Sequence, residues 1–218
     1  ANTDNDSIKP LIGKGCLEHL LSKLIKGLTF VRTKSNTVYI VVSIPGLNPY
    51  AIALDSRQGE VLIAEAVAKN TSQFPRKSNI AEIIHYSQGW AEKECPPSEV
   101  WHRVGCDPNG GIVIDSGNKE HTHFRVSASG VEILTSGSGV LFYRTSTMLP
   151  MAMPAEVGNI DLLKKYIPVH PVNFILILAW ISYTLANPKI PTSKFLVLWL
   201  QGGEGTAKSS IAKILIDL

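Results

Sequence analysis

Apolar residues recur every three or four positions in three stretches of the first hundred residues, 13–26, 58–69 and 79–94. This spacing places the apolar side chains on one face of a helix, so the pattern predicts three amphipathic helices. Gly27 follows the first stretch, where glycine is typical of a helix end, and Ser78 precedes the third as a candidate N-cap.

Between the first two predicted helices the composition changes to that of strands. Residues 28–33 and 37–43 are rich in β-branched and aromatic side chains and are separated by Lys34-Ser35-Asn36. Two such runs around a short polar turn predict a β-hairpin. Residues 45–49 contain prolines at both ends and are expected to form a loop.

Short strands are predicted after the Pro96-Pro97 pair. Runs of apolar and β-branched residues alternate there with Asp, Asn, Ser and Gly, the residues that favour turns. Turns at such short intervals are typical of an antiparallel meander. The predicted strands are 99–106, 111–115, 123–128, 131–135 and 140–144.

The C-terminal part returns to helical spacing. Residues 159–167, with Asn159 as cap, predict a short helix, and residues 172–186 predict a longer one that is apolar on every face and therefore buried. The run Lys194–Leu200, apolar at every position after Lys194, then predicts a buried strand. Residues 207–218 predict a final helix.

The bulk composition is that of an ordinary folded protein. The 218 residues are 44% hydrophobic and 18% charged, which supplies a core and argues against general disorder. The length fits one large domain or two small ones. A formal charge of +3 permits nucleic-acid binding without arguing for it.

Three features bear on the location of the protein. The apolar run 174–186 is shorter than the roughly 20 residues that span a bilayer, so no membrane segment is expected. Residues 1–7 are polar and do not resemble a signal peptide. Cys16, Cys95 and Cys106 lack metal-ligand spacing and suit a reducing compartment, so a cytoplasmic location is expected.

One motif indicates a specific chemistry. The pattern Gly-x-x-x-x-Gly-Lys-Ser/Thr between a strand and a helix forms the P-loop that binds nucleotide phosphates. Gly202 holds its first position and Lys208 and Ser209 its last two, while Ala207 replaces the expected glycine. The candidate nucleotide-binding residues are Gly202, Gly203, Glu204, Gly205, Thr206, Ala207, Lys208 and Ser209.

The residues of this loop have distinct expected roles. Its glycines allow successive N–H groups to face an anion, and the start of the following helix adds partial positive charge. Lys208 would contact the β- and γ-phosphates of ATP, and Ser209 would bind Mg²⁺. Ala207 is expected at negative φ, and Glu204 is expected to face solvent because a carboxylate repels phosphate. A glycine-rich turn with a chance Lys-Ser pair is the alternative.

Together these elements predict an α+β N-terminal region with an antiparallel sheet, followed by a small helical bundle and the first strand–P-loop–helix of a truncated α/β P-loop ATPase. An acidic Mg²⁺ ligand on a second strand and an arginine finger cannot be placed, so the ATPase domain is expected to continue past Leu218 and this chain alone to be inactive. The expected parts are an α+β domain at 1–97, an antiparallel β region at 98–155, a helical bundle segment at 156–190 and the start of the ATPase domain at 191–218.

The stretch from Val100 to Leu218 resembles phage and prophage replication ATPases of the superfamily 3, primase–helicase type. The similarity is weaker over residues 1–99, and members of the family often carry alanine before the Lys-Ser pair, as Ala207 does here. The similar segments are 100–104, 112–115, 129–133, 140–144, 148–150, 161–163, 179–180, 196–200 and 201–209.

The resemblance implies an ATP-driven, DNA-dependent helicase-like protein in the replication of a phage or other mobile element, with ATP and Mg²⁺ bound at Lys208 and Ser209. It also implies DNA as a partner and a homo-oligomeric ring, with the helices at 159–186 as an oligomerisation surface. One alternative is a DNA- or partner-binding module over residues 1–155 with an incomplete nucleotide site. A small P-loop kinase fits less well, because such kinases usually begin with the loop.

A basic stretch near the N-terminus is a second candidate site. Residues 9–34 contain six cationic side chains against the single acidic residue Glu18. These cations could contact DNA phosphates, although charge runs more often solvate a helix face. The candidate DNA contacts are Lys14, Lys23, Lys26, Arg32 and Lys34.

The histidines and tryptophans give weaker indications of a functional site than the glycine-rich motif or the basic stretch. His121 and His123 alternate along a predicted strand and would share a face, but a metal site needs a third ligand. Trp101 could stack on a base, although an aromatic residue in an antiparallel strand more often lies in the core. The tryptophans expected in the core are Trp90, Trp180 and Trp199.

Overall fold

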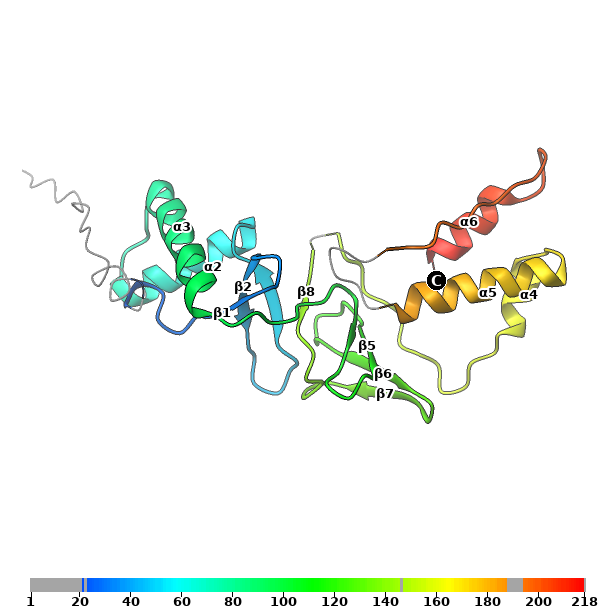
Figure 1. Cartoon of the computed structure of the whole chain (residues 1–218), viewed down its shortest axis with the longest axis horizontal. Helices are drawn as coiled ribbons and strands as arrows, with labels where there is room; N and C mark the ends of the chain where they lie inside the picture. The colour runs from blue at the N-terminus through cyan, green and yellow to red at the C-terminus, as the bar shows by residue number, and fades with distance from the viewer. Residues whose placement is uncertain (1–20, 22, 146, 188–193, 218) are drawn as a thin grey trace, which may run out of the picture. The chain divides into compact units, whose positions relative to one another are not determined.

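The structure, a computed structural model, describes residues 21, 23–145, 147–187 and 194–217 (Figure 1). The chain divides into two compact units. The first contains residues 1–45 and 49–100, and the second contains residues 46–48 and 101–218. Within the described residues, no helix combines the length and the apolar character that a membrane crossing requires.

The first unit contains an antiparallel sheet in which β1 (Thr29–Arg32) pairs with β2 (Val38–Val42), and β2 pairs with β3 (Tyr50–Ala53). The register places Phe30 opposite Ile40, and both side chains are buried. The predicted hairpin is therefore confirmed. The third strand was not predicted, because its short Tyr-Ala-Ile-Ala sequence carries little strand signal.

Two helices of the first unit, α2 (Arg57–Thr71) and α3 (Lys77–Glu94), confirm the helical periodicity. The Ser56 side chain caps α2 by accepting a hydrogen bond of 3.1 Å from the Gly59 amide. The predicted N-cap of α3 is wrong. The helix begins two residues earlier, after Arg76, so Ser78 lies within its first turn.

These elements share one hydrophobic core. Of the helix predicted over 13–26, only residues 21 and 23–26 are described, and Leu21 and Ile25 lie buried in this core. Trp90 packs against it as expected, with its ring edge-on to Phe30. The buried members are Leu21, Ile25, Phe30, Val38, Ile40, Leu54, Ile63, Val67, Ile83 and Ala91.

In the second unit, four consecutive strands pair antiparallel in chain order, which confirms four of the five strands predicted for the meander; β8 is not part of this sheet. The first is shorter than predicted because Arg103 has φ +64°, outside the strand region. Its four strands are β4 (Val104–Cys106), β5 (Ile112–Asp115), β6 (His123–Ser127) and β7 (Gly130–Leu134).

The short strand β8 (Phe142–Tyr143) follows the meander. Phe142 is fully buried with Val113 and Val140, and Trp101 packs against these three side chains. A β-bridge joins Trp101 to Phe142. Trp101 therefore packs against a core, which is the more common role of an aromatic residue in such a sheet.

The remaining helices, α4 (Asp161–Tyr166), α5 (Pro171–Ala186) and α6 (Lys208–Asp217), bury Ile167, Phe174, Ile177, Ile211 and Leu215 together. All three were predicted from periodicity. The Asn159 side chain accepts a hydrogen bond of 3.0 Å from the Asp161 amide, although the residue that directly precedes the helix is Ile160.

The predicted burial of α5 is wrong. Only Phe174 and Ile177 of this helix are buried, whereas Val172, Ile175 and Leu176 are exposed. Trp180 is partly buried against the helical core, as expected. The sequence of α5 is apolar on every face, but this pattern alone did not show whether the helix is buried or has apolar side chains at the surface.

The predicted strand Lys194–Leu200 is also wrong, because this segment pairs with no strand among the described residues. Its carbonyl oxygens instead accept hydrogen bonds from side chains of α5, from Trp180 Nε1 to Leu196 at 2.9 Å and from the Tyr183 hydroxyl to Lys194 at 3.0 Å. Trp199, expected in the core, is 81% exposed. An apolar run forms a central strand only where neighbouring strands supply backbone partners.

The fold-class prediction must be corrected accordingly. The described chain is α+β, with two small sheets rich in antiparallel pairs and five helices, and it contains no strand–P-loop–helix arrangement. The helix that follows the glycine-rich motif is present as α6, but the strand that precedes it in a P-loop fold is absent from the described residues.

Candidate functional site

The glycine-rich segment Gly202–Ala207 forms an exposed loop that leads directly into α6 (Figure 1). The loop closes on itself. The Thr206 hydroxyl donates a hydrogen bond of 2.8 Å to the Gly203 carbonyl. A Cβ atom at Gly202 would lie 2.7 Å from Thr206 Oγ1, so only glycine fits against this hydroxyl without a shift.

The ammonium of Lys208 lies over this loop. Lys208 Nζ donates to the carbonyl oxygens of Gly202 at 2.7 Å and Gly203 at 2.5 Å, and it lies 3.2 Å from Thr206 Oγ1. An ammonium has three N–H donors, and these three oxygens match that number. The positive charge is therefore held against the oxygens of the loop itself.

The first turn of α6 places the other motif residues. Ser209 is the second residue of the helix and is exposed, and the turn contains no acidic side chain. Glu204 is exposed at the far part of the loop, as a loop that accepts phosphate requires. The N-terminal end of α6 thus combines partial positive helix charge with the full charge of Lys208.

The expected backbone conformation of Ala207 is wrong. Its φ is +57°, and Gly205 two residues earlier has φ +75°. A non-glycine residue in the left-handed region costs roughly 1–2 kcal/mol because Cβ approaches the following carbonyl oxygen. Glycine would adopt this φ without that cost, which the residue pattern alone does not reveal.

The predicted DNA contacts have mixed environments. Lys14 lies outside the described residues, whereas Lys23 and Lys26 are exposed. Arg32 is occupied, since its Nε donates to the Cys95 carbonyl at 3.1 Å and its Nη1 to Asn36 Oδ1 at 2.8 Å. Lys34 lies 3.5 Å from Glu99 in an exposed ion pair.

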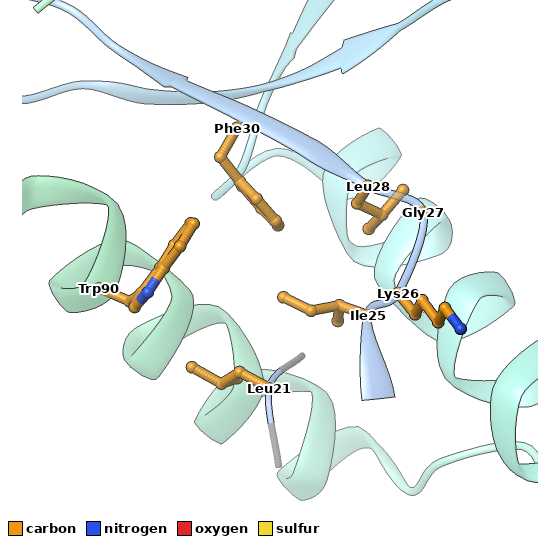
Figure 2. Close-up of a pocket in the computed structure, with 7 residues that line it drawn as sticks. All are labelled: Leu21, Ile25, Lys26, Gly27, Leu28, Phe30 and Trp90. Carbon is orange, nitrogen blue, oxygen red and sulfur yellow. The ribbon is translucent and has the colours of Figure 1, made fainter. Parts of the chain in front are cut away.

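An apolar cavity of about 280 Å³ lies in the first unit (Figure 2). The cavity borders Leu21, beside residues that the structure does not describe, and Figure 2 shows the Lys26 ammonium pointing away from it. The lining side chains are apolar apart from the Lys26 ammonium and the Trp90 indole N–H. These lining residues are Leu21, Ile25, Lys26, Gly27, Leu28, Phe30 and Trp90.

Sequence reasoning missed a buried polar cluster in the second unit. His123 Nδ1 and Ser138 Oγ share a hydrogen bond of 2.7 Å, and His123 Nε2 lies 4.0 Å from Asp115 Oδ1. Arg144 binds the same carboxylate through Nε and Nη2 at 2.8 and 2.6 Å. No sequence signal reveals this cluster, because Asp115 and His123 become neighbours only through the β5–β6 register.

The serine, histidine and aspartate of this cluster have the residue types of a hydrolase triad, but the geometry excludes that role. All three side chains are at most 1% exposed, so no substrate reaches the Ser138 hydroxyl. Asp115 is neutralised by Arg144 rather than by an imidazolium, and Ser138 Oγ also accepts the Val140 amide at 3.3 Å. The cluster instead links strands and loops of the second unit.

The charge state of His123 follows from this environment. Burial lowers the pKa of His123 to about 4, and the Arg144 charge acts in the same direction, while Asp115 opposes both. Although the distance to Asp115 is short enough for an ion pair, Arg144 lies closer to the carboxylate and takes that role. His123 is therefore neutral in the fold at neutral pH.

The two histidines do not form the pair that was considered for a metal site. His121 lies in the turn before β6 with φ +51°, so it does not alternate with His123 along the strand. Within the described part of the chain, no three His, Cys, Asp or Glu side chains are grouped closely enough to hold a metal ion.

Comparisons of the chain with protein-family models, curated proteins and solved structures find no match. The chemistry of the loop therefore rests on its own residues.

Proposed function

We propose that the loop Gly202–Ala207 and the first turn of α6 bind the phosphate groups of ATP together with Mg²⁺. One observation carries the proposal: the Lys208 ammonium lies over a closed glycine-rich loop, at the head of a helix whose first turn contains no acidic side chain. Such a helix start favours anions, because its amide N–H groups lack partners within the helix.

The contacts of Lys208 suggest how the loop would change on binding. Its hydrogen bonds are to neutral oxygens of an exposed loop. Hydrogen bonds between an ammonium and a phosphate oxygen are charge-assisted and stronger, so a phosphate would draw the ammonium from these oxygens. The exposed Ser209 hydroxyl is the proposed ligand for Mg²⁺.

The proposed biological role is that of an ATP-dependent, helicase-like replication protein of a phage or other mobile element, acting in the cytoplasm. This role is the one that the sequence resemblance of residues 100–218 to primase–helicase ATPases implies. DNA and further copies of the chain are the proposed partners. The alternative is a DNA- or partner-binding module in the N-terminal part, and one surface of the first unit, described below, favours such a contact.

Titration of the chain with a fluorescent ATP analogue, with and without Mg²⁺, tests the proposal. The Lys208→Ala variant is expected to bind about 10- to 100-fold more weakly, as the loss of hydrogen bonds to a charged group predicts. Lys213→Ala is the matched control, because Lys213 is an exposed lysine of the same helix outside the loop. Equal affinity of wild type and Lys208→Ala, or no binding by wild type, would overturn the proposal.

A further inference from the structure

The loop between α2 and α3 presents a large aromatic side chain to solvent. Phe74 is 82% exposed, among the most exposed of the large apolar side chains. The first unit has a well-packed core of its own, which Phe74 does not join. The ring is therefore accessible to a partner.

The backbone around Phe74 is restricted by its neighbours. Pro75 follows it directly and restricts the Phe74 backbone to extended conformations. On the other side, the Thr71 hydroxyl donates to the Val67 carbonyl at 2.7 Å and accepts the Gln73 amide at 3.4 Å. A restricted backbone loses less conformational entropy when a partner stacks on the ring that it carries.

The nearest charged residues on either side of Phe74 in the sequence are all basic. From Glu65 to Glu82 the intervening chain contains Lys69, Arg76 and Lys77 and no acidic residue. All three cations are exposed, and within the described residues none of the three forms an ion pair. Their charges are therefore available to an anionic partner.

A fourth cation lies at the base of the same loop. Asn70, near the end of α2, donates through Nδ2 to the backbone carbonyls of Leu24 and Lys26 at 3.1 and 3.3 Å. These hydrogen bonds fix the backbone of Lys26 beside the C-terminal end of α2. Lys26, one of the predicted DNA contacts, thereby joins the cations of the α2–α3 loop.

We infer that this surface, defined as Phe74 with Lys26, Lys69, Arg76 and Lys77, binds single-stranded nucleic acid. Proteins that bind single strands combine aromatic rings, on which bases stack, with cations that contact the phosphates. The surface supplies both groups from one loop and its base. A purely apolar protein partner would not require the surrounding positive charge. The inference is independent of the proposed nucleotide site, since it uses only residues of the first unit.

The test is fluorescence anisotropy of a labelled oligothymidylate with the full chain, without ATP. Phe74→Ala is expected to weaken binding about tenfold, within the range measured for the loss of one base–aromatic stack. Phe74→Trp should retain affinity because it preserves the stacking ring. Tyr166→Ala is the aromatic control, since Tyr166 is also well exposed but lies on α4.

The charges are tested by the salt dependence. Replacing Arg76 and Lys77 by alanine should lower the slope of log affinity against log salt by about 0.7 for each phosphate that is no longer neutralised. The same change at exposed Lys164 and Lys165 on α4 serves as control. Unchanged affinity of Phe74→Ala, loss of binding by Phe74→Trp, or an unchanged slope would overturn the inference.

Three further arms complete the design. An oligouridylate of equal length tests whether the surface distinguishes RNA from DNA, and either preference supports single-strand binding. A duplex of equal length should bind more weakly, because its bases are not free to stack on Phe74. The inference would be overturned if the duplex bound as tightly or more tightly and the Phe74→Ala substitution did not change its affinity. ATP binding by Phe74→Ala should equal that of wild type, which separates failure of this inference from failure of the nucleotide site.

Discussion

Arg144 donates two hydrogen bonds to the Asp115 carboxylate, from Nε to Oδ2 at 2.8 Å and from Nη2 to Oδ1 at 2.6 Å. The carboxylate is fully buried and the guanidinium largely so. Arg144 Nη1 also donates to the Asn118 carbonyl, which ties the turn after β5 to the residue that follows β8. One ion pair thus connects segments that are distant in sequence.

Removal of Arg144 should therefore be strongly destabilising. Arg144→Met leaves Asp115 buried without a countercharge, which typically costs about 3–5 kcal/mol. Urea unfolding followed by circular dichroism measures the loss. The double variant Arg144→Met/Asp115→Asn should recover part of it, because the uncompensated charge is gone.

The control for this prediction is an exposed ion pair in the same unit. Lys164 and Asp161 lie 2.6 Å apart, but both side chains are more than half exposed. Lys164→Met should change the unfolding free energy by less than about 1 kcal/mol. If Arg144→Met is no more destabilising than Lys164→Met, the central role of the buried pair is refuted.

The stability of the protein should fall in mild acid because of His123. Its pKa is about 4 in the fold and 6.5 in a model peptide. Between these values the unfolded chain binds a proton that the folded chain does not, so stability falls as pH decreases from 6.5 to 4. This difference between the two pKa values corresponds to roughly 3 kcal/mol of unfolding free energy. Unfolding free energies measured from pH 7 to pH 4 give the curve.

Substitution isolates the contribution of His123. Burial also lowers the pKa of His121, which adds to the slope in the same direction. His123→Asn should flatten the curve more than any other single histidine change, and His85→Asn at an exposed position of α3 serves as the reference. A curve unaffected by His123→Asn would show that this imidazole titrates alike in both states.

Local periodicity explains most of what the sequence predicted correctly. The β1–β2 hairpin, α2, α3, the meander and α6 each depend on residues close together in the chain. For these elements, the apolar spacing and the turn residues already specify which side chains share a face.

Long-range relations explain the failures. Residues 194–200 can form a strand only beside neighbouring strands, and the described residues supply none. The sequence of the run itself does not contain this information. The cluster of Asp115, His123 and Arg144 depends on strand register and on a residue beyond β8. The positive φ of Ala207 depends on closure of the loop onto Lys208. In each case the sequence shows which residues are present, but it does not show how they are arranged in space.

Glycine-to-alanine changes in two helices should have opposite effects. At Gly59 in α2, a Cβ atom would lie 2.5 Å from the carbonyl oxygens of Ala53 and Leu54, which no alanine tolerates. Gly59→Ala should therefore push α2 away from the end of β3 and destabilise the first unit by more than about 2 kcal/mol, a figure typical of forced overpacking.

Gly89 in α3 provides the matched position. A Cβ atom there would meet no neighbour within 4 Å, so Gly89→Ala should stabilise the protein by about 0.5–1 kcal/mol through helix propensity alone. Thermal unfolding of both variants shows whether the stability falls for Gly59→Ala and rises for Gly89→Ala. Equal effects at Gly59 and Gly89 would contradict the close contact at the start of α2.

The strained conformation of Ala207 leads to the last prediction. Because its φ is +57°, Ala207→Gly should remove a penalty of about 1 kcal/mol and stabilise the loop and α6. The same substitution at Ala212, inside α6, should instead cost about 1 kcal/mol, since glycine weakens a helix interior. Hydrogen exchange of the α6 amides reads out both changes.

The two variants also separate loop geometry from helix stability in ATP binding. Ala207→Gly should bind ATP at least as well as wild type, because the glycine adopts the observed φ without strain and leaves Lys208 in place. Ala207→Val, with a β-branched side chain at positive φ, should weaken both exchange protection and binding. If Ala207→Gly instead lowered the protection of α6 as Ala212→Gly does, the loop would not adopt the left-handed conformation at this residue.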